Sequence, residues 1–344
     1  MELRSNGSEK KYKWIKEIIE KGFIGEYASH LLDTEDNVHV FYFDEVNGDL
    51  KHAVKGPNGW SIERVDREGT VGQFLAIARD AAGKIYVCYR DQGKDRLKMA
   101  FFEDNQWHIE VVDNEPFASF DTSIAVDSHG KVYISYYNLE KGYLKVACRD
   151  NDQWAVEIVD GGQEQSDAVG GFSSCKVDVR GRLHVSYVDS KNGLLKYAVR
   201  DNGVWQLEVA DDSEFVGSFT SLALDQEGNP YISYTVDKRP NKPDLWFAKK
   251  VKGQWLTELV DSAEIAGNYS SIAVDQQSNI YISYSAMQAL KLATKSGGIW
   301  SIEVAEPKGT VTYTSISIDS HGMPHITYCD KDRGVNYVHK VKDE

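Results

Sequence analysis

Four ionisable side chains occupy positions where the other copies of a repeated sequence unit carry mostly small, apolar or aromatic residues. They are His30, Arg79, Asp121 and Lys176. Imidazole, carboxylate and amine groups are the usual general acids and bases, and a guanidinium can stabilise developing negative charge. A charge in a packed interior is unfavourable unless it is paired, hydrated or bound to a ligand. The four residues could therefore form one polar site of a hydrolase or lyase, or water could accommodate each one separately.

A second set of candidate residues follows a repeated tyrosine in the motif Y-x-[D/N]. Its members are Asp44, Asp91, Asn138, Asp189 and Asp330, with Asp237 shifted by one residue. A ring of such side chains could bind a cation, or a cationic or hydroxylated ligand. Asp and Asn also begin turns by accepting hydrogen bonds from backbone amides. The sequence leaves both interpretations open.

Aromatic residues begin the first strand of nearly every unit. They are Tyr27, Phe74, Phe172, Phe219, Tyr269 and Tyr313, whereas the third unit has Asp121 there and Phe120 one residue earlier. Aromatic rings could stack on sugar faces, which makes Tyr27 and Phe74 candidate ligand contacts. They could equally pack between neighbouring units.

The elements that position these residues are revealed by seven evenly spaced tryptophans. The intervals between them are 45–51 residues, and a glutamate lies three residues after each one. The tryptophans are Trp14, Trp60, Trp107, Trp154, Trp205, Trp255 and Trp300, and the glutamates are Glu17, Glu63, Glu110, Glu157, Glu208, Glu258 and Glu303. Self-similarity at this period is typical of propeller blades.

Each unit divides into four short runs of alternating hydrophobicity, as in TSIAVDSHGKVYISYYNLEKGYLKVACRDNDQWAVEIVD from 122 to 160. The first run ends in an aspartate, which we expect to cap the following turn, and the second ends in a tyrosine. Four short strands per unit predict an all-β, seven-bladed β-propeller with four antiparallel strands per blade.

The order of the runs also predicts how the ring closes. The chain opens on a fourth-strand pattern at Trp14 and ends on a third-strand pattern at 335–340. The N-terminal strand should therefore complete the last blade, which removes the open sheet edges. We expect a polar tail at 1–11 and one propeller domain at 12–344, in place of the two or three domains that the length alone suggests.

A lysine in the third strand lies twelve residues before the glutamate of the fourth in five units. The pairs are Lys51–Glu63, Lys98–Glu110, Lys145–Glu157, Lys196–Glu208 and Lys291–Glu303. A hairpin centred between the two residues would place them opposite one another. The spacing therefore predicts a cross-strand ion pair.

Through these repeats the chain resembles bacterial seven-bladed propellers built of SIAVD–YISY–LKYA–GxW blades, over residues 12–342. The resemblance implies the fold and leaves the function open. The Asp box of sialidase-like blades, the GH…WD pair of WD40 repeats and the AxDxxTGxxxW pattern of quinoprotein blades are all missing. No GxSxG, HExxH or phosphate-loop motif is present either.

Composition narrows the range of partners. The formal charge of 39 − 53 = −14 disfavours nucleic acid and a polybasic membrane anchor. We expect no cofactor, no metal and a monomer. The partner should be a glycan, a small molecule or a protein, bound at the loop face or the central channel. The polar N-terminus lacks a signal-peptide pattern, which is expected of a cytoplasmic protein or of a trimmed secreted one.

Overall fold

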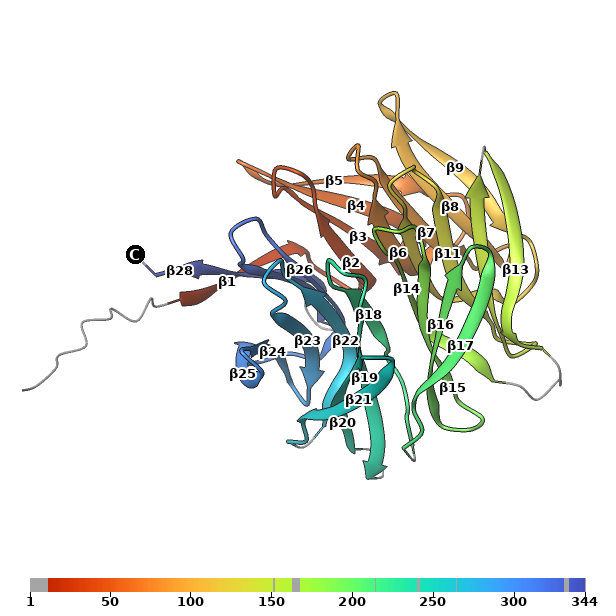
Figure 1. Cartoon of the computed structure of the whole chain (residues 1–344). Helices are drawn as coiled ribbons and strands as arrows, with labels where there is room; N and C mark the ends of the chain where they lie inside the picture. The colour runs from red at the N-terminus through yellow and green to blue at the C-terminus, as the bar shows by residue number, and fades with distance from the viewer. Residues whose placement is uncertain are drawn as a thin grey trace, which may run out of the picture.

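The structure is a computed structural model that describes residues 12–150, 152–162, 168–213, 215–239, 242–263, 265–330 and 334–343. Its strands form seven four-stranded antiparallel sheets arranged as blades around a central axis (Figure 1). The predicted all-β, seven-bladed propeller is therefore confirmed. The tail expected at 1–11 lies outside the described residues.

In each of the first six blades the four strands follow one another in chain order from the axis outward. The first blade contains β2 (Glu26–Leu32), β3 (Val38–Asp44), β4 (Asp49–Gly56) and β5 (Gly59–Asp66). The second contains β6 (Val71–Arg79), β7 (Ile85–Asp91), β8 (Arg96–Glu103) and β9 (Gln106–Asp113). The third contains β10 (Ala118–Val126), β11 (Val132–Asn138), β12 (Tyr143–Asp150) and β13 (Gln153–Gly161).

The next three blades repeat this arrangement. The fourth contains β14 (Val169–Val177), β15 (Leu183–Asp189), β16 (Leu194–Asp201) and β17 (Val204–Asp211). The fifth contains β18 (Ser221–Leu224), β19 (Pro230–Arg239), β20 (Lys242–Val251) and β21 (Gln254–Asp261). The sixth contains β22 (Ala266–Val274), β23 (Ile280–Ala286), β24 (Ala289–Ser296) and β25 (Ile299–Glu306).

The seventh blade joins the two ends of the chain. It contains β26 (Val311–Ile318), β27 (Pro324–Asp330), β28 (Gly334–Lys342) and, as its outermost strand, β1 (Tyr12–Glu20). Trp14 pairs with Lys340 in this antiparallel seam, which lies beside the C-terminus in Figure 1. The predicted closure of the ring by the N-terminal strand is thus confirmed.

Gly334 should be essential for this seam. Its backbone has φ +91°, and a Cβ placed there would lie 2.1 Å from the carbonyl oxygen of Glu20 in β1. We therefore expect Gly334→Ala to lower the free energy of unfolding by roughly 3 kcal/mol or more, as measured in urea. The alanine would have to hold an unfavourable φ, and the backbone at Glu20 would have to move away from its Cβ. Gly83 is a matched control, since its φ is +92° but nothing lies within 4 Å of its added Cβ. A Gly83→Ala loss as large as that of Gly334→Ala would contradict the steric argument.

The hydrophobic core lies between blades rather than within them. Seven clusters of buried apolar side chains are present, and each combines residues of two neighbouring blades. The repeated tyrosine of the second strand is among the largest fully buried side chains in every blade. Because neighbouring blades cover both faces of each sheet, the second and third strands are buried along most of their length, whereas the outermost strand is largely exposed.

The repeated turn aspartates act as predicted. Asp33 Oδ1 accepts hydrogen bonds from the backbone amides of Glu35 and Asn37 at 2.8 and 2.9 Å. Asp80, Asp127, Asp178, Asp225, Asp275 and Asp319 make the same pair of bonds in the other blades.

The predicted cross-strand pairing of lysine with glutamate is wrong. A two-residue turn pairs Gly56 with Gly59, which places Lys51 opposite Arg64 and leaves Glu63 opposite His52. Successive side chains of a strand point to opposite faces, so Lys51 and Glu63 lie on different faces of the sheet. The register is displaced by one residue in the other blades too.

Both residue types instead join one blade to the next. The ammonium of Lys98 lies 2.8 Å from the carboxylate of Asp66 in the preceding blade, which also accepts a hydrogen bond from Tyr89. Glu110 accepts hydrogen bonds from Trp154 and Arg149 of the following blade at 3.1 and 2.9 Å. The repeated charges therefore hold the ring together.

Candidate binding site in the central channel

A cavity of about 470 Å³ lies on the axis, where the innermost segments of all seven blades meet. Three successive positions line it in six of the blades, and two do so in the second blade. The first of these positions holds Tyr27, Phe74, Asp121, Phe172, Phe219, Tyr269 and Tyr313. The other two positions hold mainly serine and threonine.

The six aromatic residues form a continuous arc around the cavity. Ring centroids lie 5.0 Å apart for Phe172 and Phe219, and 4.5 Å apart for Phe219 and Tyr269. The arc continues from Tyr269 to Tyr313, from there to Tyr27 and finally to Phe74, with centroid separations of 4.8, 4.6 and 4.6 Å. The planes of neighbouring rings are inclined to one another by 43–55°, and the centroid separations are typical of favourable aromatic contacts.

A strained backbone presents these side chains to the channel. All seven residues at this position have φ between +48° and +58° although none is glycine. In the first blade Glu26 pairs with Phe43 and Ser29 with Phe41, so the inner strand carries one extra residue there. A left-handed backbone costs about 1–3 kcal/mol per residue, and repeating it in every blade indicates a built feature of the channel.

Asp121 fills the gap in the aromatic arc. Its Oδ2 accepts a hydrogen bond of 2.9 Å from the backbone amide of Phe172. Burial raises the pKa of this carboxyl above its usual range. Burial also raises the pKa of Tyr27 to about 12, and the negative charges of Glu26 and Asp121 act in the same direction.

Hydroxyl groups beside the arc connect the blades. Thr220 donates a hydrogen bond to the carbonyl of Phe172 at 2.7 Å, and Ser174 accepts one from the amide of Leu222 at 3.0 Å. Further bonds of the first kind join Thr122 to Phe74, Ser173 to Asp121, Ser270 to Phe219, and Thr314 to Tyr269. The sequence reasoning missed these bonds; the signal was the Ser and Thr that recur just after the aromatic position.

The proposed catalytic residues do not meet. His30 bridges the first and last blades, with Nδ1 3.0 Å from Thr327 Oγ1 and Nε2 2.6 Å from Ser317 Oγ. Burial, with the neighbouring charge of His325, lowers the pKa of His30 to about 3.

Arg79 and Lys176, two more of the proposed catalytic residues, come later in their strands than the residues that line the cavity. Arg79 is the last residue of β6, and Lys176 lies two residues beyond Ser174 on β14. The Lys176 side chain keeps contact with solvent, but the protein surrounding it lowers its pKa. Of the four residues, only Asp121 lines the cavity.

Five of the Y-x-[D/N] residues are buried, whereas the shifted Asp237 is exposed. Asp44 Oδ1 accepts hydrogen bonds from the amides of Val46 and Asn47, and its Oδ2 lies 2.7 Å from the Lys51 ammonium. Asp91, Asn138 and Asp189 likewise accept a backbone hydrogen bond from the loop that follows them. This is the turn-forming geometry rather than a ring of carboxylates open to a ligand.

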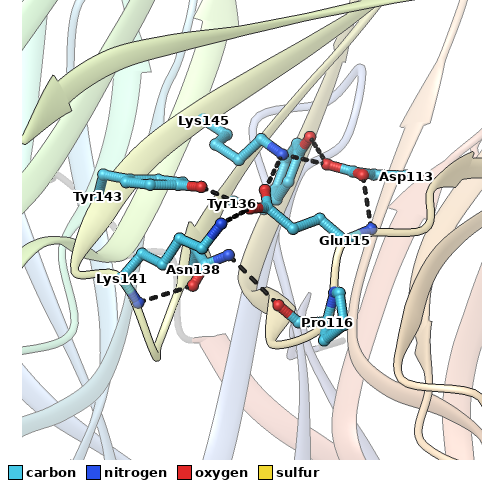
Figure 2. Close-up of polar contacts among 8 residues, drawn as sticks. All are labelled: Asp113, Glu115, Pro116, Tyr136, Asn138, Lys141, Tyr143 and Lys145. Atoms are coloured by element: carbon cyan, nitrogen blue, oxygen red, sulfur yellow. Dashed lines mark hydrogen bonds and ion pairs between the residues drawn. The ribbon is translucent and has the colours of Figure 1, made fainter. Parts of the chain in front are cut away.

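The densest polar network outside the channel surrounds one of these loops. Figure 2 shows Glu115 between Lys141, Lys145 and Tyr143, all of which contact its carboxylate. Burial works to raise the pKa of Glu115, but these hydrogen bonds outweigh it and lower the pKa to about 2. Because each charge already has a protein partner, the network stabilises the junction of the second and third blades.

Among the described residues, no group of three or more His, Cys, Asp or Glu side chains is placed to hold a metal ion. The four cysteines are free and buried: Cys88, Cys148, Cys175 and Cys329. Nor does the described part of the chain contain a helix long and apolar enough to cross a membrane.

Comparisons with known proteins support the fold. No protein-family model matches the sequence, and no curated protein does. Solved structures do match, at low sequence identity. One is an ulvan lyase from a new family of polysaccharide lyases, solved with a bound saccharide of glucuronic acid and sulfated rhamnose. The two sequences are 13% identical, the match covers 93% of this chain and 94% of the lyase, and the TM-score is 0.66.

Two further structures show the same likeness. A fungal lectin from Aleuria aurantia, described as a six-bladed propeller with a novel mode of fucose recognition, has 16% identity over 82% of this chain and 95% of its own, with a TM-score of 0.56. A protein of unknown function from Dyadobacter fermentans has 11% identity over 93% of this chain and 99% of its own, with a TM-score of 0.58. At these identities the likeness is one of fold.

Proposed function

We propose that this protein binds a glycan in its central channel, with a sugar ring held against the aromatic arc. The observation that carries the proposal is the arc itself: six aromatic side chains around one cavity of about 470 Å³. Sugars present C–H faces that pack on aromatic rings, and pockets of about 300–1,000 Å³ are usual for small ligands. The cavity is large enough for one or two sugar units.

Two observations support this choice of ligand. Holding seven non-glycine residues in a left-handed backbone opposes stability, so the aromatic position is maintained for something other than packing alone. Among the structural neighbours are a fucose-recognising lectin and polysaccharide lyases. A lyase or hydrolase acting through His30, Arg79, Asp121 and Lys176 is less well supported, because those side chains do not share one pocket.

A glycan array, followed by calorimetry with the best ligand, tests the proposal. Phe219→Ala opens the middle of the arc and should weaken binding at least tenfold, since its ring contacts both Phe172 and Tyr269. Phe102→Ala is the control, because this exposed phenylalanine lies at the outer end of β8 and away from the channel. Binding that survives Phe219→Ala unchanged, or an array without any hit, would refute the proposal.

A further inference from the structure

One of the seven equivalent positions around the cavity differs in chemistry from the others. Six hold aromatic rings, and the seventh holds the carboxylate of Asp121 between Phe74 and Phe172. One carboxylate oxygen is held by the amide of Phe172, which orients the group without neutralising it. The described residues give Oδ1 no hydrogen-bond partner, and Asp121 lines a cavity whose other walls are rings and hydroxyls.

Among the residues that the structure describes, no cation balances this charge. In the described part of the chain Asp121 forms no ion pair with Lys, Arg or His. Arg90 lies 4.2 Å above the ring of Phe120, the residue before Asp121, and is paired with Asp95 at 2.8 Å. Lys176, on the neighbouring strand, makes no ion pair with Asp121.

A carboxylate beside aromatic rings is the arrangement that favours an organic cation. Ammonium groups are attracted to the negative faces of aromatic rings, and a charged hydrogen bond to a carboxylate adds direction and strength. A neutral sugar would leave the buried charge of Asp121 unbalanced, which opposes binding. The site therefore distinguishes a cationic ligand from a neutral one of the same shape.

We propose that the ligand of this channel is an amino sugar whose ammonium group binds Asp121 while its ring lies against the aromatic arc. This inference rests on the proposed glycan binding and names its ligand class. It makes Asp121 a specificity-determining residue and not a catalytic one.

Two disaccharides that differ only at nitrogen provide the test: chitobiose with both amines free, and its N,N′-diacetyl form. Isothermal titration calorimetry at pH 6 should show at least tenfold tighter binding of the free amine by the unchanged protein. Asp121→Asn keeps the oxygen that accepts from Phe172 but removes the charge, and should abolish the preference. Asp121→Phe restores the aromatic type of the other blades and should shift any preference to the acetylated form.

The outcomes separate the two proposals. Equal affinity for both disaccharides, or a preference that survives Asp121→Asn in a protein with an unchanged melting temperature, overturns the amino-sugar inference and leaves glycan binding standing. If neither disaccharide binds, the inference is again overturned, and the glycan array alone decides whether the channel binds a neutral or an acidic glycan.

Discussion

Asp66→Ala is expected to lower the free energy of unfolding by about 3–5 kcal/mol, because it removes the nearer of the two carboxylates that contact the buried Lys98. The side chains of Lys98 and Asp66 are only 4% and 1% exposed, and their charged atoms lie 2.8 Å apart. Removing the carboxylate leaves the Lys98 ammonium with Asp91 at 3.4 Å and takes the hydrogen-bond acceptor from Tyr89. Urea unfolding at pH 7.5 measures the loss.

Two variants control this experiment. Adding Lys98→Met to Asp66→Ala removes the buried cation that has lost its nearest carboxylate and should recover most of the lost stability. The equivalent substitution Asp160→Ala should cost only about 1–2 kcal/mol, because Lys196 and Asp160 are 17% and 19% exposed and water can replace the lost partner. Equal losses at both aspartates would show that burial does not set the strength of these contacts.

His30 should make the protein sensitive to acid. Its pKa is about 3 in the folded protein, against 6.5 in an unfolded chain. Between these two pH values the unfolded state binds a proton that the folded state does not, so stability falls as the pH falls through this window. From pH 7.5 to pH 4 the contribution of His30 amounts to about 3 kcal/mol.

His30→Leu provides the comparison, since Leu222 occupies the same place in the fifth blade. At pH 7.5 the variant should be less stable by about 1–2 kcal/mol, because Ser317 and Thr327 lose their partner. At pH 4 the order should reverse. His129→Gln, on an exposed turn, should follow the unchanged protein at every pH. A constant difference between His30→Leu and the unchanged protein from pH 7.5 to pH 4 would contradict the buried neutral imidazole.

The fold could be predicted because each blade repeats the same physical solution. Seven Trp–Glu pairs and seven turn aspartates give the blade count, and the strand order at the two termini gives the seam between β1 and β28. The partners of the charged residues could not be predicted in the same way. Lys98 and Asp66 are 32 residues apart in the sequence. Spacing along the chain favours a pairing within one hairpin, where the partners are only twelve residues apart.

The site was predicted only in part for a related reason. Tyr27 and Phe74 do line the cavity. The left-handed backbone at this position could not be predicted, because it occurs at residues other than glycine. The departures from the repeat can be found in the sequence, yet departure alone does not say where a side chain goes. His30 joins two blades, whereas Asp121 faces the cavity, and only coordinates distinguish the two cases.

The single carboxylate in the aromatic arc also decides how a ligand can face. Seven equal blades would offer a small molecule seven equivalent orientations about the axis, and selecting one of them costs RT ln 7, about 1.1 kcal/mol. Asp121 makes one orientation unlike the other six. A hydrogen bond between the ligand and this carboxylate would contribute about 1.5–3 kcal/mol, which exceeds the cost of selecting that orientation. In the proposed complex, this one carboxylate would therefore determine which side of an asymmetric ligand faces the third blade.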